Sequence, residues 1–389
     1  MTDRSSRKMY VFLLVLTVAA FGGLQGWRTI FNNFAVETVG ISGAQMGALQ
    51  SLREVPGFLA LLAVYVLLFI SQHRLAALSV VLMGLGVALT GYLPTYSGLI
   101  LTTLLMSFGF HYFETMNQSL TLQYFGLKQA PLVMARLRSM GAVTNLVVGG
   151  LIWVLAAHLE YRTMFLAMGV LAALLGLWAV TRDPTRHDLP AQRKELVFRK
   201  KYWLFYVLTF LSGGRRQIFV AFAVFLLVER YGYSVQQITL LFVLNNVVNW
   251  LVNPYIGRAV NRFGERAVLS VEYGSLFFVF GAYALVDSAL VAGLLYVLDN
   301  VFFNCAMAIK TYYQKIADPG DMASGMAVGF TVNHVAAVVV PVLGGLAWMV
   351  DYRVVFLGAS VLSLVSLALS QLVGRPKTRT IDSDRAKQV

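Results

Sequence analysis

The chain has 389 residues, of which 58% are hydrophobic and only 13% are charged. Soluble domains carry about 25% charged residues, so this composition, with a mean hydropathy of +0.70, excludes a soluble protein. The net charge of +13 means that a nucleic-acid ligand has to be considered. The chain has a single cysteine, Cys305, which excludes an internal disulfide and a cysteine-based zinc cluster.

Twelve apolar stretches are long enough to cross a bilayer, which takes about 20 helical residues. None of them alternates with the period of a β-strand. The sequence therefore predicts an all-α membrane protein with twelve transmembrane helices. We place them at residues 9–35, 43–70, 75–93, 97–121, 136–158, 163–181, 202–229, 235–256, 267–286, 288–313, 322–350 and 353–373.

Three of the first six predicted spans carry polar side chains deep in the membrane. A charge at the bilayer centre costs about 2.5–3.5 kcal/mol, so it must face a partner or a wet cavity. Helical spacing places these residues on common faces of the first and fourth spans. They are Gln25, Arg28 and Asn32 in the first span, Arg53 and Glu54 in the second, and His111, Glu114 and Gln118 in the fourth.

The longest polar interruption is the basic segment 182–201, which contains Pro184 and Pro190. It predicts a linker between a six-helix bundle at 1–181 and a second bundle at 202–374. The polar residues 375–389 are predicted to be a disordered tail.

The second half also places polar residues inside its spans. Arg215 and Arg216 are adjacent in the seventh span, so their side chains point about 100° apart. One is expected to neutralise Glu114 or Asp299, while the other faces a cavity. The remaining polar positions are Thr209 and Ser212 in the seventh span, Asn246, Asn249 and Asn253 in the eighth, and Asp299 in the tenth.

Short sequence repeats connect the two halves. Tyr161-Arg162-x-x-Phe165-Leu166 recurs as Tyr352-Arg353-x-x-Phe356-Leu357, about half the chain later, and Ser42-x-x-Gln45 recurs as Ser234-x-x-Gln237 at a similar offset. Duplicated bundles are common in secondary transporters, because two similar units can rock about a site between them. We therefore expect two pseudo-symmetric halves.

Basic residues are concentrated in the termini and in the loops after even-numbered spans. Only Arg162, Arg230 and Arg353 lie in the opposite loops. Cytoplasmic loops retain positive charge, so both termini are predicted to be cytoplasmic. The basic charge then reflects membrane orientation, and no nucleic-acid partner is expected.

The loop after the eighth span reads Gly257-x-x-x-Asn261-Arg262-x-Gly264-x-Arg266. It resembles the signature G-x-x-x-D-R-x-G-x-R of the major facilitator superfamily (MFS), with Asn261 in place of the usual aspartate. Pro341-x-x-Gly344-Gly345 resembles the end of the family's antiporter signature, although it lies in the eleventh span.

This resemblance implies the MFS fold, transport by alternating access, and a cavity lined by the first, second, fourth, seventh and tenth spans. It also implies a monomer. We expect the loop residues Gly257, Asn261, Arg262, Gly264 and Arg266 to control a gate, since the glycines permit close approach and the arginines can bind acidic groups or helix C-termini.

The predicted spans contain four arginines but only three central carboxylates, those of Glu54, Glu114 and Asp299, so the cavity is expected to be neutral to cationic. The planar guanidinium suits carboxylate and phosphate groups. The sequence thus predicts a bacterial inner-membrane secondary transporter of a small anionic or zwitterionic solute. The candidate substrate-binding residues are Arg28, Arg53, Arg215, Arg216, Gln25, Asn32, Asn246, Asn249 and Asp299.

Proton coupling is expected at Glu114, His111 and Glu54, although Arg53 and Glu54 could simply form an internal ion pair. His111 and Glu114 offer two ligands without a third, so no metal site is predicted, and no cofactor is expected.

Three alternatives remain open: efflux of apolar or cationic drugs, an enzyme acting on lipids, and a sensor that binds ligand without transporting it. No phosphate-binding G-x-x-x-x-G-K-[ST] loop occurs, which argues against an ATP-driven pump. No nucleophile or metal triad accompanies His111 and Glu114, so we expect that the protein is not an enzyme.

Overall fold

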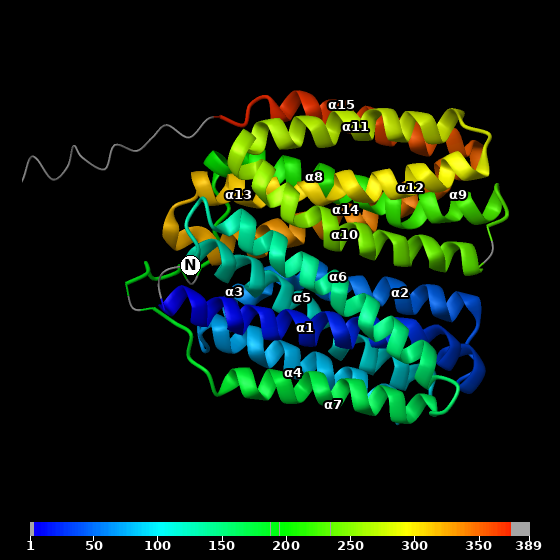
Figure 1. Cartoon of the computed structure of the whole chain (residues 1–389), viewed down its shortest axis with the longest axis horizontal. Helices are drawn as coiled ribbons and strands as arrows, with labels where there is room; N and C mark the ends of the chain where they lie inside the picture. The colour runs from blue at the N-terminus through cyan, green and yellow to red at the C-terminus, as the bar shows by residue number, and fades with distance from the viewer. Residues whose placement is uncertain (1–3, 187, 194, 234, 375–389) are drawn as a thin grey trace, which may run out of the picture.

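The computed structural model describes residues 4–186, 188–193, 195–233 and 235–374. The predicted tail at 375–389 lies outside these residues. All regular structure in the described part is helical, and its helices run along one long axis (Figure 1).

The first half contains six long helical segments. Two of them change helix type along their length: α1 continues into a π-helical turn at Phe34–Thr38, and α2 continues through a 3₁₀ turn at Leu59–Leu62 into the short α3 (Ala63–Val66). The six main helices are α1 (Arg4–Asn33), α2 (Gly43–Phe58), α4 (Gln72–Thr90), α5 (Tyr96–Tyr124), α6 (Ala130–Leu155) and α7 (Tyr161–Val180).

The second half repeats this pattern. Here α8 continues through a π-helical turn at Ile218–Ala223 into α9, and α12 continues through a 3₁₀ turn at Asn304–Ala306 into α13. The helices are α8 (Trp203–Gln217), α9 (Val224–Glu229), α10 (Val235–Phe263), α11 (Glu265–Leu285), α12 (Ala289–Phe303), α13 (Met307–Ile316), α14 (Met322–Val350) and α15 (Tyr352–Ser370).

These segments amount to twelve membrane-spanning helices within the described residues, which confirms the predicted number. Nine of them are long and apolar enough to cross a membrane by length and composition alone. Helices α5, α10 and α14 are not among the nine, and both α5 and α10 carry buried polar side chains. The buried ones include His111 and Asn117 in α5 and Asn245 and Asn253 in α10, which lie inside the protein rather than toward lipid.

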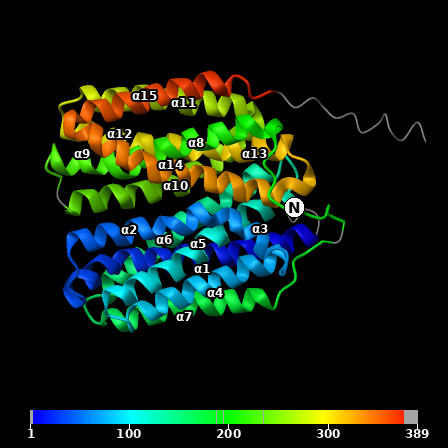
Figure 2. The ribbon, with the colours of Figure 1, turned by 180° about the vertical axis from the view of Figure 1, so that it is seen from behind.

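The helices form two bundles, α1–α7 and α8–α15, which lie side by side in both views (Figures 1 and 2). Helix α6 packs against α10, and α2 packs against α14, across the boundary between the bundles. Both ends of the described chain lie at the same end of the molecule, which we call the terminal end; the other is the distal end (Figure 1).

Local sequence explains several helix boundaries. Ser42 and Gln45 form a reciprocal capping box at the start of α2, with the Ser42 amide donating to Gln45 Oε1 at 2.9 Å. Asp351 caps α15 by accepting from the Arg353 amide at 2.8 Å. Gly264, with φ of +83°, separates α10 from α11, because only glycine adopts this conformation without steric cost.

Direct contacts hold the halves together at the terminal end. Gln314 Nε2 donates to the carbonyls of Leu122 and Phe125 at 2.6 and 2.7 Å. Asn261 Nδ2 donates to the Lys128 carbonyl at 2.6 Å. Closer to the middle, Thr331 Oγ1 donates to the Phe58 carbonyl at 2.9 Å. The two bundles are therefore closed against each other at this end.

Candidate functional site

Three arginines from both halves converge between the bundles. Arg28 on α1 lies close enough to Arg53 on α2 and Arg216 on α8 for their charges to act on it, together with Glu54 and Tyr296. The Arg28 side chain is exposed to solvent although protein atoms surround it. Arg28 is therefore accessible although it lies near charged residues of both halves.

Only part of this positive charge is neutralised. Arg53 Nη2 lies 2.9 Å from Glu54 Oε1, and these two side chains are 26% and 24% exposed. The internal ion pair considered from the sequence is therefore formed. Within the described residues, neither Arg28 nor Arg216 has a carboxylate within 4.0 Å, so this cluster of three arginines has an excess of positive charge.

Arg215 points in another direction than its neighbour. Its side chain is 2% exposed, donates from Nη1 to Ser366 Oγ, and places Nη2 3.8 Å from Glu272 Oε1. Its guanidinium carbon lies 4.4 Å from the centre of the Tyr273 ring. Asp299, with 1% exposure, also lies near Arg215. The structure thus places Arg215 and Asp299 in the interior of the second half, and neither belongs to the cluster of Arg28, Arg53 and Arg216.

The polar side chains of α10 form hydrogen bonds with neighbouring helices. Asn246 Oδ1 accepts from Asn145 Nδ2 across the boundary at 3.2 Å. Asn249 Oδ1 accepts from Asn300 and Asn304 at 2.8 and 2.6 Å. These residues of the predicted stripe thus connect α10 to α6 through Asn246 and to the α12 segment through Asn249.

The polar residues of α1 behave differently. Gln25 Nε2 donates to Thr29 Oγ1 at 3.2 Å along the same helix. Asn32 is exposed, nearer the distal end than Arg28. The predicted stripe of α1 is therefore accessible to solvent.

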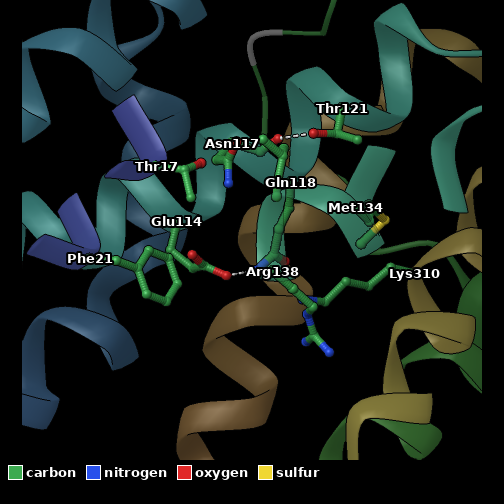
Figure 3. A pocket seen from close by; sticks show the side chains of 10 residues that line it. Thr17, Phe21, Glu114, Asn117, Gln118, Thr121, Met134, Arg138 and Lys310 are labelled. Carbon is green, nitrogen blue, oxygen red and sulfur yellow. Dashed lines mark hydrogen bonds between the residues drawn. The ribbon is translucent and has the colours of Figure 1, made fainter. Parts of the chain in front are cut away.

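Glu114 faces a small cavity of about 30 Å³ between the bundles (Figure 3). Gln118 Nε2 donates to Glu114 Oε1 at 2.6 Å. Arg138 on α6 and Lys310 on α13 also line this cavity, and Arg138 Nη1 donates to the Asn304 carbonyl at 3.2 Å. A volume of this size holds about one water molecule, so the cavity is too small for an organic solute in this conformation.

Sequence reasoning missed Arg138 and Lys310, because both were counted with the basic residues of the loops. The structure places both inside helices, where they line the cavity that contains Glu114. Arg138 lies near the predicted edge of its span, and such edges are uncertain by a few residues. The sequence did offer a signal for Lys310, because this residue lies within the predicted span 288–313.

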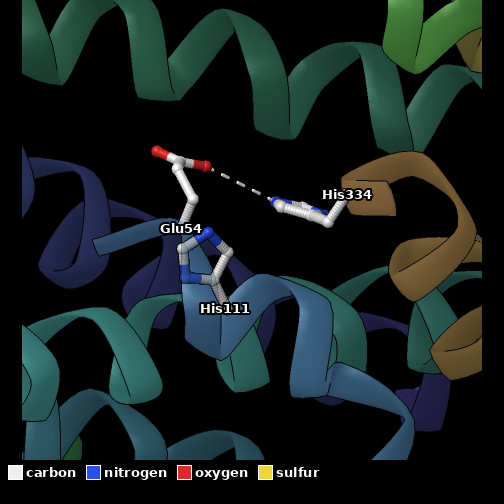
Figure 4. A group of neighbouring side chains, drawn as sticks. All are labelled: Glu54, His111 and His334. Atoms are coloured by element: carbon white, nitrogen blue, oxygen red, sulfur yellow. Dashed lines mark ion pairs between the residues drawn. The ribbon is translucent and has the colours of Figure 1, made fainter. Parts of the chain in front are cut away.

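A third group joins Glu54 and His111 to His334 on α14 (Figure 4). His334 Nε2 lies 3.9 Å from Glu54 Oε2, and the ring centres of His111 and His334 are 5.1 Å apart. The three residues predicted for proton coupling therefore occupy two places. Glu54 and His111 lie in this cluster, whereas Glu114 lies in the small cavity.

The predicted gating loop lies at the terminal end. Asn261 contacts the first half through Lys128, as described above, and a Cβ at Gly257 would lie 2.7 Å from the Pro131 carbonyl oxygen. Arg266 Nε donates to Gln371 Oε1 at 3.0 Å within the second half. Arg262 is exposed, 5.2 Å from the Phe263 ring centre. Gly257 and Asn261 are thus the loop residues that contact the other bundle.

Two helical bundles that enclose charged side chains in a membrane-spanning protein define a membrane transporter. The sequence pattern of the Major Facilitator Superfamily matches residues 9–341. The chain belongs to the Major Facilitator Superfamily. Its relatives by family and fold are transporters rather than enzymes, which confirms the expectation that it is not an enzyme.

Solved structures of the same fold share little sequence with the chain. FucP, an MFS transporter in the outward conformation, has a TM-score of 0.78 and 12% identity, covering 96% of this chain and 100% of its own. The human organic anion transporter MFSD10 has a TM-score of 0.68 and 14% identity, covering 95% and 100%.

A bacterial homologue of the iron transporter ferroportin, in an outward-facing state, has a TM-score of 0.74 and 12% identity, covering 94% and 99%. A comparison with curated protein sequences gives no match. These likenesses support the predicted fold and leave the substrate open.

Proposed function

We propose that this protein is a secondary transporter of a small organic anion or zwitterion. The observation that carries the proposal is the convergence of Arg28, Arg53 and Arg216, of which only Arg53 has a carboxylate partner among the described residues. Arg216 is half-buried without a carboxylate partner, and such a charge inside a membrane protein is costly. A bound carboxylate or phosphate would offset that cost through charge-assisted hydrogen bonds.

The position of the cluster also fits alternating access. Arg28 and Arg53 belong to the first half and Arg216 to the second, so one bound anion would contact both bundles. Closure at the terminal end and solvent access to Arg28 correspond to a conformation open toward the distal end. The basic residues near the terminal end support a cytoplasmic location for it, and the open side would then face away from the cytoplasm.

Transport assays on purified protein in liposomes test this proposal. Labelled mono- and dicarboxylates should be taken up by the unaltered protein. Arg28→Ala and Arg216→Ala should each reduce uptake at low substrate concentration by about tenfold or more, because a charge-assisted hydrogen bond contributes about 1.5–3 kcal/mol. Arg216→Lys, which keeps the charge but loses the planar fork, should give an intermediate defect.

Arg258→Ala is the matched control, because Arg258 is exposed and lies over the Tyr255 ring at 4.5 Å, outside the cluster. Size-exclusion chromatography in detergent identifies any variant that fails to fold. Unchanged anion uptake in both cluster variants would refute the proposed site. Uptake of cationic or apolar drugs, insensitive to these substitutions, would instead favour the multidrug alternative.

A further inference from the structure

Glu54, His111 and His334 bring three potential metal ligands together from three helices, α2, α5 and α14 (Figure 4). One nitrogen of each imidazole and one carboxylate oxygen lie within 4.8 Å of one another. The first two residues belong to the first half and His334 to the second. Neither histidine has a role in the proposed anion site.

The other nitrogen of each ring fixes the orientation of the ligand atoms. His111 Nδ1 lies 2.9 Å from the Ser107 carbonyl oxygen, and His334 Nδ1 lies 2.9 Å from the Phe330 carbonyl oxygen. A carbonyl only accepts, so Nδ1 carries the proton in both rings. Each Nε2 therefore presents a lone pair, and a backbone hydrogen bond on the opposite nitrogen is typical of metal-binding histidines.

Hydrogen bonding also prepares the carboxylate. Arg53 Nε and Nη2 both donate to Glu54 Oε1, at 3.3 and 2.9 Å, which leaves Oε2 directed toward His334. Ser107 Oγ donates to the Arg53 carbonyl, so its lone pairs remain available to His111 Nδ1 at 2.9 Å. Neighbouring groups thus hold both the acid and one histidine in place.

His334 Nε2 provides the second, independent observation. Its side chain is 2% exposed, and this nitrogen is buried without a hydrogen-bond partner. The 3.9 Å separation from Glu54 Oε2 is too long for a hydrogen bond. Leaving a buried polar atom unsatisfied costs free energy, and a bound cation would remove that cost.

We propose that Glu54, His111 and His334 bind a divalent transition-metal ion between the two halves. Two imidazoles and one carboxylate match the ligands of Zn²⁺ and similar borderline ions, whereas Mg²⁺ and Ca²⁺ prefer oxygen ligands. In a tetrahedral site with bonds of about 2.0–2.2 Å the ligand atoms lie roughly 3.3 Å apart. The ligand atoms, which now lie within 4.8 Å of one another, would have to move closer by up to roughly 1.5 Å, which requires a small approach of α14 to α2 and α5 on metal binding.

Three protein ligands leave a fourth coordination position for water or for another molecule. The bound ion would link α2 and α5 to α14, and it would stabilise the conformation in which these helices are close together. Arg216, whose charge acts on Glu54 and both histidines, opposes the cation and limits its affinity. The site is thus suited to reversible binding rather than to a permanent structural metal.

Calorimetric titration with Zn²⁺ tests the proposal on the full chain, purified with an affinity tag that contains no histidine. We expect saturable binding of one ion. His111→Ala and His334→Ala should each weaken binding at least about tenfold, since even changes to groups behind the ligands cost 10–100-fold. Glu54→Gln, which preserves shape, tests the third ligand if an alanine variant fails to fold.

His158→Ala is the matched control, because His158 is exposed on the turn between α6 and α7 and lies apart from the cluster. Co²⁺ provides a spectroscopic check: the unaltered protein should give the visible absorption of a four-coordinate ion, and the His334→Ala variant should lose it. The assignment would be overturned if the His111→Ala and His334→Ala variants bound Zn²⁺ as tightly as the unaltered protein, or if the His158→Ala variant lost binding. These readouts need no organic anion, so they succeed or fail independently of the proposed transport activity.

Discussion

At the scale of single residues, Asn261 shows how one atom changes a contact between the halves. Its side-chain amide donates to the Lys128 carbonyl at 2.6 Å. An aspartate, which the family signature has at this position, could only accept there when ionised. The asparagine is therefore explained by the backbone oxygen that it meets.

The first prediction replaces this donor. Asn261→Asp places a carboxylate against a carbonyl and should favour opening of the terminal end by roughly 1–2 kcal/mol. A reporter cysteine at Thr121, which is buried in the Glu114 cavity, should then react about 5–30 times faster with a water-soluble maleimide. The measurement uses a Cys305→Ala background, with Arg258→Ala as the control. If the maleimide labelled the Thr121 cysteine at the same rate in the Cys305→Ala background, in the Asn261→Asp variant and in the Arg258→Ala control, this hydrogen bond would not keep the terminal end closed.

The second prediction concerns Glu114, which we propose as the proton-carrying group. Arg138 and Lys310 line the same cavity, and Arg216 acts on both of these cations. Gln118 is the hydrogen-bond partner of the carboxylate. Glu114→Gln should abolish substrate accumulation driven by an imposed pH gradient but preserve exchange of labelled for unlabelled substrate. Accumulation that still follows the pH gradient in this variant would exclude Glu114 as the carrier.

Sequence alone identified most of the polar residues at these sites but did not group them correctly. Helical spacing placed His111, Glu114 and Gln118 on one face, yet His111 lies against His334 whereas Glu114 lines the small cavity with Lys310. The reason is that partners on α14 and α13 come from the other half of the chain, and no local periodicity encodes their position. The orientation of Arg216 relative to Arg215 was better defined, because adjacent helical residues diverge by a fixed angle.

At the scale of elements, the helices were largely predictable and their ends were not. Apolar length gave all twelve spans, but α10 runs to Phe263, beyond the predicted end at 256, and α6 begins at Ala130 rather than 136. The extension of α10 contains Arg258, Asn261 and Arg262, whereas the six residues that precede 136 in α6 are apolar and are followed by Arg136 and Arg138. Hydropathy measures membrane burial, whereas backbone hydrogen bonding sets where a helix ends.

The described residues of the linker at 182–201 make specific contacts with the second half. Asp321, at the start of α14, is fully buried and accepts a hydrogen bond from Tyr202 at 2.7 Å. Arg199 Nε and Arg193 Nη1 lie 3.0 and 3.4 Å from its carboxylate oxygens. The ion pairs of the Asp321 carboxylate with Arg193 and Arg199 therefore bind the linker to the second half.

The third prediction follows from this contact. Asp321→Asn removes the charge that binds two arginines, and each charged hydrogen bond contributes about 1.5–3 kcal/mol. Limited trypsin digestion should cut the linker of this variant about 10–100 times faster, because cleavage follows the population of the released segment. Asp318→Asn is the comparison variant: that side chain is 38% exposed and pairs with Lys201 at 2.6 Å and with Arg199 at 3.3 Å, and because these pairs are exposed their loss should have a smaller effect than loss of the buried Asp321. Equal cleavage of the two variants would contradict the role given to Asp321.

At the scale of the whole molecule, the two bundles meet through small residues and a limited set of polar contacts. Gly57 on α2 approaches the His334 ring so closely that a Cβ there would lie 2.3 Å from the ring carbon Cδ2. Gly257 makes a similar approach to Pro131. Small residues and few hydrogen bonds allow two surfaces to pack closely and to separate again, as rocking of rigid halves requires.

The final prediction tests whether the closed terminal end must open during transport. Cysteines at Lys128 and Asn261 in a Cys305→Ala background should form a disulfide on oxidation, because the present hydrogen bond joins these two residues directly. The disulfide should stop net transport while the purified protein still binds substrate from the distal side, since only the terminal gate is locked. A reducing agent should restore transport, and each single-cysteine variant should be unaffected by oxidant. Because the bond fixes one end of the interface only, continued transport by the fully cross-linked protein would mean that the substrate path does not pass between the halves at this end, and the rocking of two rigid bundles would have to be abandoned.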